Sequence, residues 1–245
     1  MSKKRLTKKQ KKRRQKICFF ILILFVVLST STLYYLIKGG IGLVRSFGES
    51  DINYAPSSKP SIQQNVNTKD NLAALIKPSI NEMLLTPNEY SRPQIPLTTV
   101  NGIVVHYVGN PNTSATANRN YFNDLAKTKT TYASAHYVID MDGTILQCIP
   151  LDEIAYCSND RNEDTISIEV THPDKTGKFT RESYNSLIQL LSYLSIVYEL
   201  EVDDIIRHYD VSGKLCPLYY VEHPDKWEQL KVDVSDSIKT YTTKK

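Results

Sequence analysis

Cysteine is scarce in this sequence, with four residues among 245. Four thiols are too few for the disulfide scaffold of a small secreted domain. No two of them form a Cys-x-x-Cys pair, so the short zinc-finger patterns are absent as well. Cys148 and Cys157 leave two interpretations open: a disulfide bridge in an oxidising exterior, or two unpaired thiols in the core.

Internal repeats are also lacking, and strands alternate with helices too rarely for a doubly wound fold. A hydrophobic content of 41% and 16 tyrosines are typical of a globular protein. A chain of 245 residues accommodates one compact domain with an additional anchor or tail. The expected fold class is therefore α/β, with a mixed central β-sheet flanked by helices.

Acidic residues are missing from residues 1–16, which hold ten Lys or Arg. Residues 17–245 carry 20 basic against 26 acidic residues, so the net charge of +4 arises from the N-terminal segment. A nucleic-acid-binding protein needs its basic excess on the folded domain. We therefore expect no nucleic-acid partner.

Charge is absent from residues 17–37, a run rich in Phe, Ile, Leu and Val. A helix of this length spans about 30 Å, which is the thickness of a bilayer's hydrocarbon core. The preceding positive charges predict a single-pass cell-membrane protein with a cytoplasmic N-terminus and an extracytoplasmic domain. The alternative is a cleaved signal peptide, whose apolar region is normally shorter and ends at small residues. Here the apolar residues 33–36 follow the small residues 29–32, which favours an uncleaved anchor.

The predicted organisation has five parts. They are a basic cytoplasmic N-terminus (1–16), a transmembrane helix (17–37), an extracytoplasmic linker or stalk (38–84), a folded domain (85–232) and a C-terminal tail (233–245). The linker is inferred from scattered Gly, Ser, Asn, Gln and Pro without a sustained hydrophobic period.

Within the folded domain, apolar patterning predicts both strands and helices. Strands are expected at 103–108, 136–140, 144–149 and 165–171, and another begins at Ile205. Helices are expected after Ser114 and after Thr180, and a short helix opens at Pro224. Alternation along 165–171 places Ile166 and Ile168 on one face and Glu169 on the other.

Three side chains suggest a metal site. His106 lies at the end of a strand beside a glycine loop, and a second loop with a glycine can bring His208 and Cys216 to one place. Two imidazoles and a thiolate suit Zn²⁺ with a fourth position left for water, as in catalytic sites. The spacing alone is a weak signal, because a single histidine at a strand end is more often a hydrogen-bonded core residue.

Four segments occur together in an order that resembles a known family: Val105–Tyr107, Ala133–Asp140, Ile166–Val170 and His208–Pro217. They are similar to the type-2 N-acetylmuramoyl-L-alanine amidases, relatives of peptidoglycan recognition proteins and of phage amidase endolysins. The resemblance covers residues 85–232, and the Lys-Leu-Cys-Pro ending of the last segment is its most diagnostic part.

This resemblance implies zinc-dependent hydrolysis of the amide bond between N-acetylmuramic acid and L-alanine in peptidoglycan. It implies that His106, His208 and Cys216 bind zinc, which activates the attacking water. Glu169 would act as general base and acid, on the strand face that leads into the cleft. Lys214 matches the position where the family carries a cation near the oxyanion.

Some phage members of the family carry a catalytic tyrosine where Ala135 stands here, and its absence assigns the acid–base work to Glu169. Tyr107 and Asn110 could line the groove that binds the sugar and stem peptide, or could be packing residues. His136 could orient substrate or support the sheet.

The expected partners are peptidoglycan, through its glycan strand and stem peptide, and the cytoplasmic membrane; the chain is expected to be a monomer. One alternative is a non-catalytic peptidoglycan-binding module on the same fold, although relatives that only bind usually lack the cysteine ligand that Cys216 supplies. A zinc carboxypeptidase or endopeptidase is a second alternative. Its motifs, such as His-x-His, are not found together with a third ligand.

Overall fold

The computed structural model describes residues 70–74 and 76–242. The expected transmembrane helix at 17–37 lies outside these residues, as do the basic N-terminus and most of the expected linker. Among the described residues, no helix combines the length and the apolar character needed to cross a bilayer.

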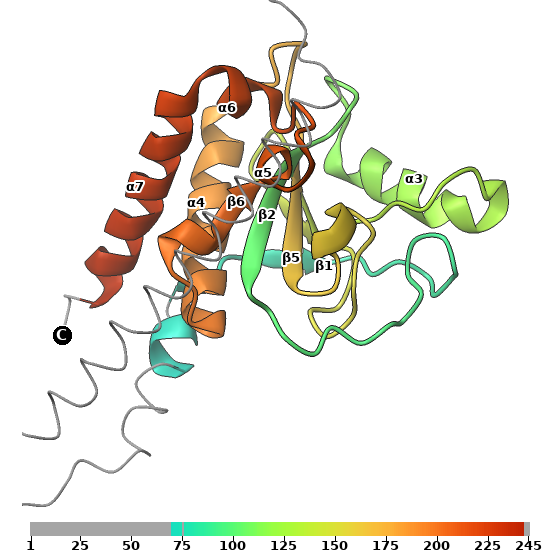
Figure 1. The fold of residues 1–245 in the computed structure, drawn as a ribbon, viewed down its shortest axis with the longest axis horizontal. Helices are drawn as coiled ribbons and strands as arrows, with labels where there is room; N and C mark the ends of the chain where they lie inside the picture. The colour runs from blue at the N-terminus through green and yellow to red at the C-terminus, as the bar shows by residue number, and fades with distance from the viewer. Residues whose placement is uncertain (1–69, 75, 243–245) are drawn as a thin grey trace, which may run out of the picture. The chain divides into compact units, whose positions relative to one another are not determined.

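A mixed six-stranded sheet, in the order β1-β4-β3-β5-β2-β6, forms the centre of the domain (Figure 1). Its strands are β1 (Ile80–Glu82), β2 (Gly102–Tyr107), β3 (Tyr137–Ile139), β4 (Ile145–Gln147), β5 (Thr165–Val170) and β6 (Ile205–Arg207). β3 and β4 pair antiparallel, and the other neighbouring strands of this sheet pair in parallel. The mixed sheet confirms the predicted α/β class.

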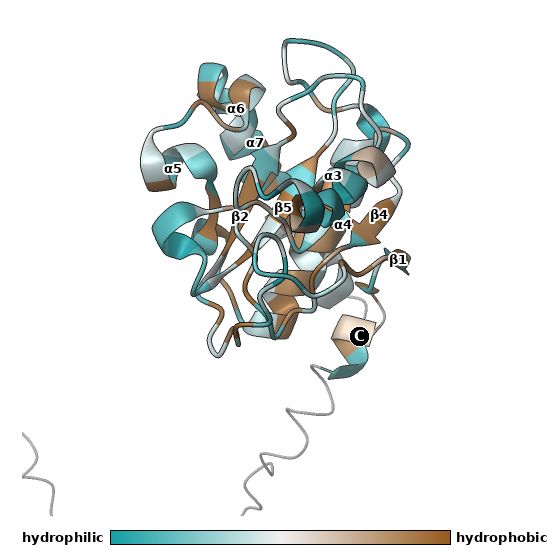
Figure 2. Cartoon of the chain, turned by 90° about the vertical axis from the view of Figure 1, so that its right-hand side faces the viewer, coloured by the Kyte–Doolittle hydropathy of each residue, from teal (hydrophilic) through white to brown (hydrophobic). Residues whose placement is uncertain are grey.

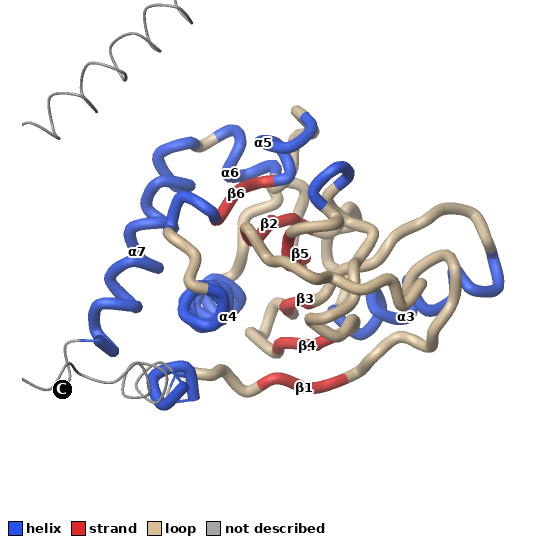
Figure 3. The backbone as a smooth tube through the Cα atoms, turned by 60° about the horizontal axis from the view of Figure 1, so that its bottom comes forward, coloured by secondary structure: helices blue, strands red, loops and turns tan. Residues whose placement is uncertain are grey.

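Helices cover both faces of the sheet (Figure 3). The long helices α4 (Arg181–Tyr198) and α7 (Pro224–Thr242) lie on one side, and α3 (Ala115–Thr128) lies on the other. The shorter elements are η1 (Asn159–Arg161), η2 (Val202–Asp204), α5 (His208–Ser212) and α6 (Leu218–Glu222). Ser114 and Thr180 cap α3 and α4 as predicted, because each hydroxyl oxygen accepts a hydrogen bond from a backbone N–H three residues later, at 3.1 Å.

Strand alternation places successive side chains of β2 and β5 on opposite faces of the sheet. Ile103 and Val105 of β2 and Ile166 and Ile168 of β5 are fully buried against the apolar stripe of α4. Burial of each such side chain contributes about 1.5–3 kcal/mol. The intervening residues of both strands face the side of α3, a helix that is coloured largely as hydrophilic in Figure 2. The chemistry-bearing side chains of β2 and β5 are therefore directed away from the main core.

The folded unit extends past both boundaries expected from the sequence. β1, which falls in the expected linker, pairs in parallel with β4. At the other end, α7 continues to Thr242, through most of the tail expected at 233–245. The reason is an apolar stripe at helical spacing, Trp227, Leu230 and Val234, which is buried against the core and continues the helix beyond residue 232.

Candidate active site

His106 and Glu169 occupy neighbouring positions on the central strands. They are direct register partners in the parallel ladder between β2 and β5. Side chains of paired residues lie on the same face of a sheet, so both face the side of α3. β6 lies on the other side of β2 and ends at Arg207, which brings the next residue, His208, to the same end of the sheet.

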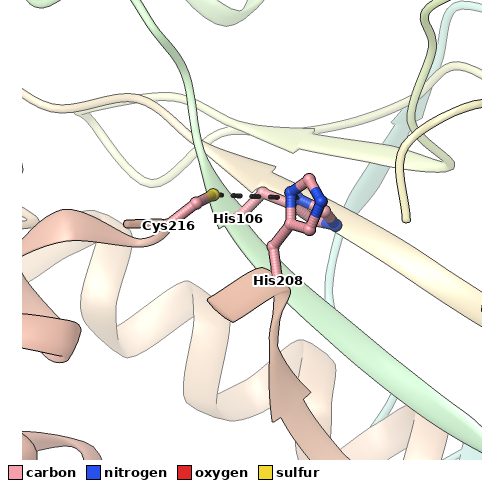
Figure 4. Close-up of side chains that lie close together, drawn as sticks. All are labelled: His106, His208 and Cys216. Carbon is pink, nitrogen blue, oxygen red and sulfur yellow. Dashed lines mark hydrogen bonds between the residues drawn. The ribbon is translucent and has the colours of Figure 1, made fainter. Parts of the chain in front are cut away.

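A tight loop brings Cys216 back to His208. Helix α5 starts at His208 and ends at Ser212, and the next residue, Gly213, has a φ of 77°, the left-handed conformation that glycine adopts after helix ends. The backbone N–H of Tyr209 then donates a hydrogen bond to the carbonyl oxygen of Cys216 at 2.9 Å, which closes the loop. Figure 4 shows the sulfur and the two imidazole rings converging on one point.

The three side chains have the spacing of a metal site. Nδ1 of His106 lies 3.1 Å from Nδ1 of His208 and 3.8 Å from Sγ of Cys216, and all three residues are buried. Their ligand atoms lie within 4.8 Å of one another. Tetrahedral zinc with its usual bond lengths places two nitrogens ~3.3 Å apart and nitrogen and sulfur ~3.6 Å apart. The donor set predicted from the sequence is therefore brought together, and its geometry fits Zn²⁺ with one open vertex.

Burial sets the protonation of these ligands. Desolvation lowers the pKa of His106 well below its usual value, and the charges of His208 and Lys214 lower it further. Desolvation, followed by the charge of Lys214, also lowers the pKa of His208. Both imidazoles are thus held in the neutral form that binds metal. Burial raises the pKa of Cys216 to about 12, with the charge of Glu169 adding and a backbone hydrogen bond from Tyr107 opposing; a bound cation would favour its thiolate.

Glu169 has one carboxylate oxygen without a partner. Its Oε2 is buried and accepts no hydrogen bond from the residues that the structure describes, while Oε1 lies 3.7 Å from Sγ of Cys157. Desolvation raises the pKa of Glu169 to about 7, against the opposing effects of Lys214 and Cys157. A desolvated carboxylate with a raised pKa in a cleft is typical of catalytic acids and bases. Glu169 is therefore a candidate acid or base on grounds that do not depend on the motif.

A cavity of about 470 Å³ joins these groups. Its lining includes His106, His208, Glu169 and Lys214, and its wall includes Tyr132 and Tyr156. The two residues expected to carry the catalysis, Glu169 and Lys214, thus face one space with the two histidines. A carboxylate, a cation and a candidate metal position in one cleft can support hydrolysis of a polar bond.

His136 does not reach this cavity. Its side chain is 0% exposed, its Nδ1 accepts a hydrogen bond from the backbone N–H of Ser167 at 3.0 Å, and its Nε2 donates to the carbonyl oxygen of Glu153 at 2.9 Å. Substrate contact through His136 is therefore wrong, because both nitrogens are engaged in the interior. The second interpretation, support of the sheet, is the one the structure bears out.

Tyr107 and Asn110, the two other residues considered for substrate binding, lie in different surroundings. Tyr107 stacks on His172 with 5.0 Å between ring centroids, which is a packing role. Asn110 is exposed and lines an adjoining hollow that also reaches Glu169. Of the two, Asn110 has the position from which a substrate could be contacted.

Sequence reasoning missed a turn beside the cavity. Cys157 is a free thiol, as is Cys148, so the disulfide interpretation of this pair is wrong. Ser158 Oγ lies 3.1 Å from Nε2 of His106, and Asn159 Oδ1 lies 2.6 Å from Nε2 of His208. No motif marks these residues; the available signal is only the turn-forming composition of the segment Ser-Asn-Asp-Arg-Asn.

Known sequences that are similar to this chain are described as N-acetylmuramoyl-L-alanine amidases. A family model described as N-acetylmuramoyl-L-alanine amidase matches residues 96–218. A probable N-acetylmuramoyl-L-alanine amidase of Bacillus licheniformis is 35% identical over 145 residues, which are 55% of this chain and 41% of the relative. The N-acetylmuramoyl-L-alanine amidase CwlL of the same species is 32% identical over 171 residues, 64% of this chain and 47% of CwlL. The chain thus spans less than half the length of these curated relatives.

Solved structures share the fold. The catalytic domain of XlyA has a TM-score of 0.55 at 22% identity, covering 64% of this chain and 99% of that domain. The Staphylococcus aureus hydrolase AmiA, determined in complex with its ligand, has a TM-score of 0.51 at 20% identity, covering 75% of this chain and 94% of AmiA. At these identities the likeness establishes the fold.

Proposed function

We propose that this chain, which belongs to the N-acetylmuramoyl-L-alanine amidase family, hydrolyses the amide bond between N-acetylmuramic acid and L-alanine in peptidoglycan. The observation that supports this most is the convergence of His106, His208 and Cys216 beside the unpartnered carboxylate of Glu169. Curated relatives are named for the same activity.

The proposed cofactor is Zn²⁺, held by His106, His208 and Cys216. The ion would polarise the scissile carbonyl and lower the pKa of a water in its open position towards neutrality. Two neutral nitrogens and one thiolate leave the site with a net positive charge. That charge favours the negative oxygen that develops on the amide carbon.

Glu169 supplies the proton transfers. Its carboxylate takes the proton of the attacking water and delivers it to the amide nitrogen, so that the amine departs neutral. Its partial burial favours this role, because a desolvated carboxylate binds a proton more readily than an exposed one. The ammonium group of Lys214 lines the same cavity. Its charge would stabilise the oxyanion that develops during the reaction.

Aromatic side chains form one wall of the cavity and offer a surface for the substrate. Tyr132 is 52% exposed, stacks on Tyr90 with centroids 5.0 Å apart and meets Tyr156 edge-on at 5.5 Å. Rigid, partly exposed tyrosines combine an apolar face with a polar hydroxyl. We assign this wall to the sugar or stem peptide that flanks the scissile bond.

We further propose that the N-terminal residues hold the enzyme at the membrane. Residues 17–37 would anchor the chain with its N-terminus in the cytoplasm, as the charge of residues 1–16 favours. The catalytic domain would then face the cell exterior, where peptidoglycan lies.

The test incubates the full chain with purified peptidoglycan, with and without a metal chelator, and identifies the products by mass spectrometry. The expected result is release of stem peptides that begin at L-alanine, lost with the chelator and regained with added Zn²⁺. A Cys216→Ala variant is expected to behave like the chelated protein. Binding to peptidoglycan without release of peptides would replace the hydrolase by a recognition module on the same fold.

A further inference from the structure

Three consecutive residues of one turn each contact a different group of the site. Cys157 Sγ lies 3.7 Å from the carboxylate of Glu169, Ser158 Oγ lies 3.1 Å from Nε2 of His106, and Asn159 Oδ1 lies 2.6 Å from Nε2 of His208. The three contacted groups come from β5, β2 and the start of α5. A single short segment therefore contacts residues from three different elements of the site.

The turn itself is rigidly held. The side-chain oxygen Oδ1 of Asn162 accepts hydrogen bonds from the backbone N–H groups of Cys157, at 3.0 Å, and of Ser158, at 2.6 Å. The backbone N–H of Arg161 donates to the carbonyl oxygen of Ser158 at 3.0 Å, and its guanidinium pairs with Asp164 at 2.7 Å. These bonds fix the positions from which Ser158 and Asn159 meet the histidines.

Asparagine suits position 159 for two reasons, its backbone conformation and its side-chain contact. Its backbone has a φ of 52°, in the left-handed region that asparagine tolerates better than most residues. Its side-chain oxygen is an acceptor only, so the contact to His208 requires the hydrogen on Nε2 of the imidazole. A neutral imidazole with its hydrogen on Nε2 presents the lone pair of Nδ1, which is the nitrogen that faces His106 and Cys216.

We propose that Ser158 and Asn159 are positioning residues for the metal site, each binding the outer nitrogen of one histidine so that the inner nitrogen is directed at the ion. This inference rests on the zinc site of the proposed function. Outer hydrogen bonds of this kind fix the tautomer and the ring orientation of a ligand histidine, and their loss typically weakens metal affinity or activity 10–100-fold. Cys157, which precedes them in the same turn, contacts the carboxylate of Glu169.

The direct test measures the affinity of the full chain for Zn²⁺ alone, by competition with a chromogenic chelator. In Asn159→Gly the left-handed backbone stays accessible while the amide is lost, and the dissociation constant is expected to rise about 10–100-fold. Ser158→Ala is expected to act in the same direction through His106. Asn159→Asp retains an acceptor for the Nε2 hydrogen, so it is expected to bind zinc at least as tightly as the wild type.

The matched control is Asn120→Ala, which removes the same amide from an exposed position of α3 and is expected to leave zinc affinity unchanged. Circular dichroism confirms that each variant is folded. Folded Asn159→Gly and Ser158→Ala proteins with wild-type zinc affinity would overturn the positioning role while leaving the proposed function intact. A wild-type chain that hydrolyses peptidoglycan without binding zinc would overturn both the metal site and this inference.

Discussion

His106 and Glu169 are paired directly across the ladder between β2 and β5, so a predicted metal ligand and the predicted base are held by consecutive backbone hydrogen bonds of the sheet. A shift of either strand by one residue would turn its side chains to the opposite face. Ile103 and Ile166 oppose that shift, because they form a second register pair of the same ladder and are fully buried in the core. Core packing therefore fixes the distance between His106 and Glu169.

Replacing the base is expected to abolish most of the activity. Glu169→Gln keeps the shape of the side chain but cannot accept the proton of water, so kcat is expected to fall about 10²–10⁴-fold. The initial rate of stem-peptide release gives the activity, and atomic absorption gives the bound zinc, which is expected to stay at the wild-type level. Glu163→Gln, at an exposed position, is the control. Wild-type turnover in Glu169→Gln would remove Glu169 from the mechanism.

The charge of Lys214 is expected to act on the transition state more than on binding. Loss of one oxyanion-stabilising group typically costs about 10²–10³-fold in kcat, and we expect a loss at the lower end for Lys214→Met, because this lysine is exposed. Lys214→Arg is expected to retain more activity than Lys214→Met. Steady-state kinetics separate kcat from KM. An effect on KM alone would instead make Lys214 a substrate-binding residue.

His136 is expected to make the fold sensitive to acid. Burial lowers its pKa to about 4, from 6.5 in an unfolded chain. Its neutral form is thus favoured in the folded state, and the stability this provides is fully present above pH 6.5 and is lost as the pH falls towards 4. The shift corresponds to about 3 kcal/mol.

Chemical denaturation of wild type and His136→Gln between pH 4 and 8 measures this contribution. The wild type is expected to lose stability more steeply than the variant below pH 6.5, whatever the absolute stability of the variant. Parallel pH curves would contradict the assignment.

The core between the sheet and α4 is expected to dominate stability. Leu191 on α4 is 0% exposed, so Leu191→Ala is expected to lower the free energy of unfolding by about 2–5 kcal/mol. Val232→Ala on α7 is the comparison, because Val232 is 51% exposed and its truncation is expected to cost less than about 0.5 kcal/mol. Urea denaturation curves compare the two. Equal effects would mean that the packing of α4 is looser than described.

The cysteines are expected to remain reduced and to react unequally. Cys148 is buried and desolvation raises its pKa to about 12, so alkylation is expected only after unfolding. Cys157 is partly exposed in the cavity and is expected to react in the native protein, slowly because desolvation raises its pKa as well. Peptide mapping before and after denaturation distinguishes the two, and a Cys148–Cys157 disulfide in the native protein would contradict the structure.

The sequence alone was enough to predict those parts of the site that depend on short-range patterns. Alternation along β5 placed Glu169 opposite Ile168, and the loop from His208 to Cys216 carried a recognisable motif. The contacts of Ser158 and Asn159 could not be predicted, because each joins residues about 50 positions apart and depends on the turn that Asn162 holds. β1 was missed for a related reason. It is only three residues long, so it carries too little local pattern, and it is a strand because it pairs with the distant β4.

The two outer strands of the sheet, β1 and β6, are each three residues long. Unpaired strand edges are where sheets of separate molecules join, and short edges offer few free N–H and C=O groups for that purpose. When many copies of this domain are crowded together, as on a surface, the edge strands of one copy therefore offer few free backbone groups with which a strand of another copy can pair. The fold is expected to resist aggregation by edge-to-edge pairing under crowding.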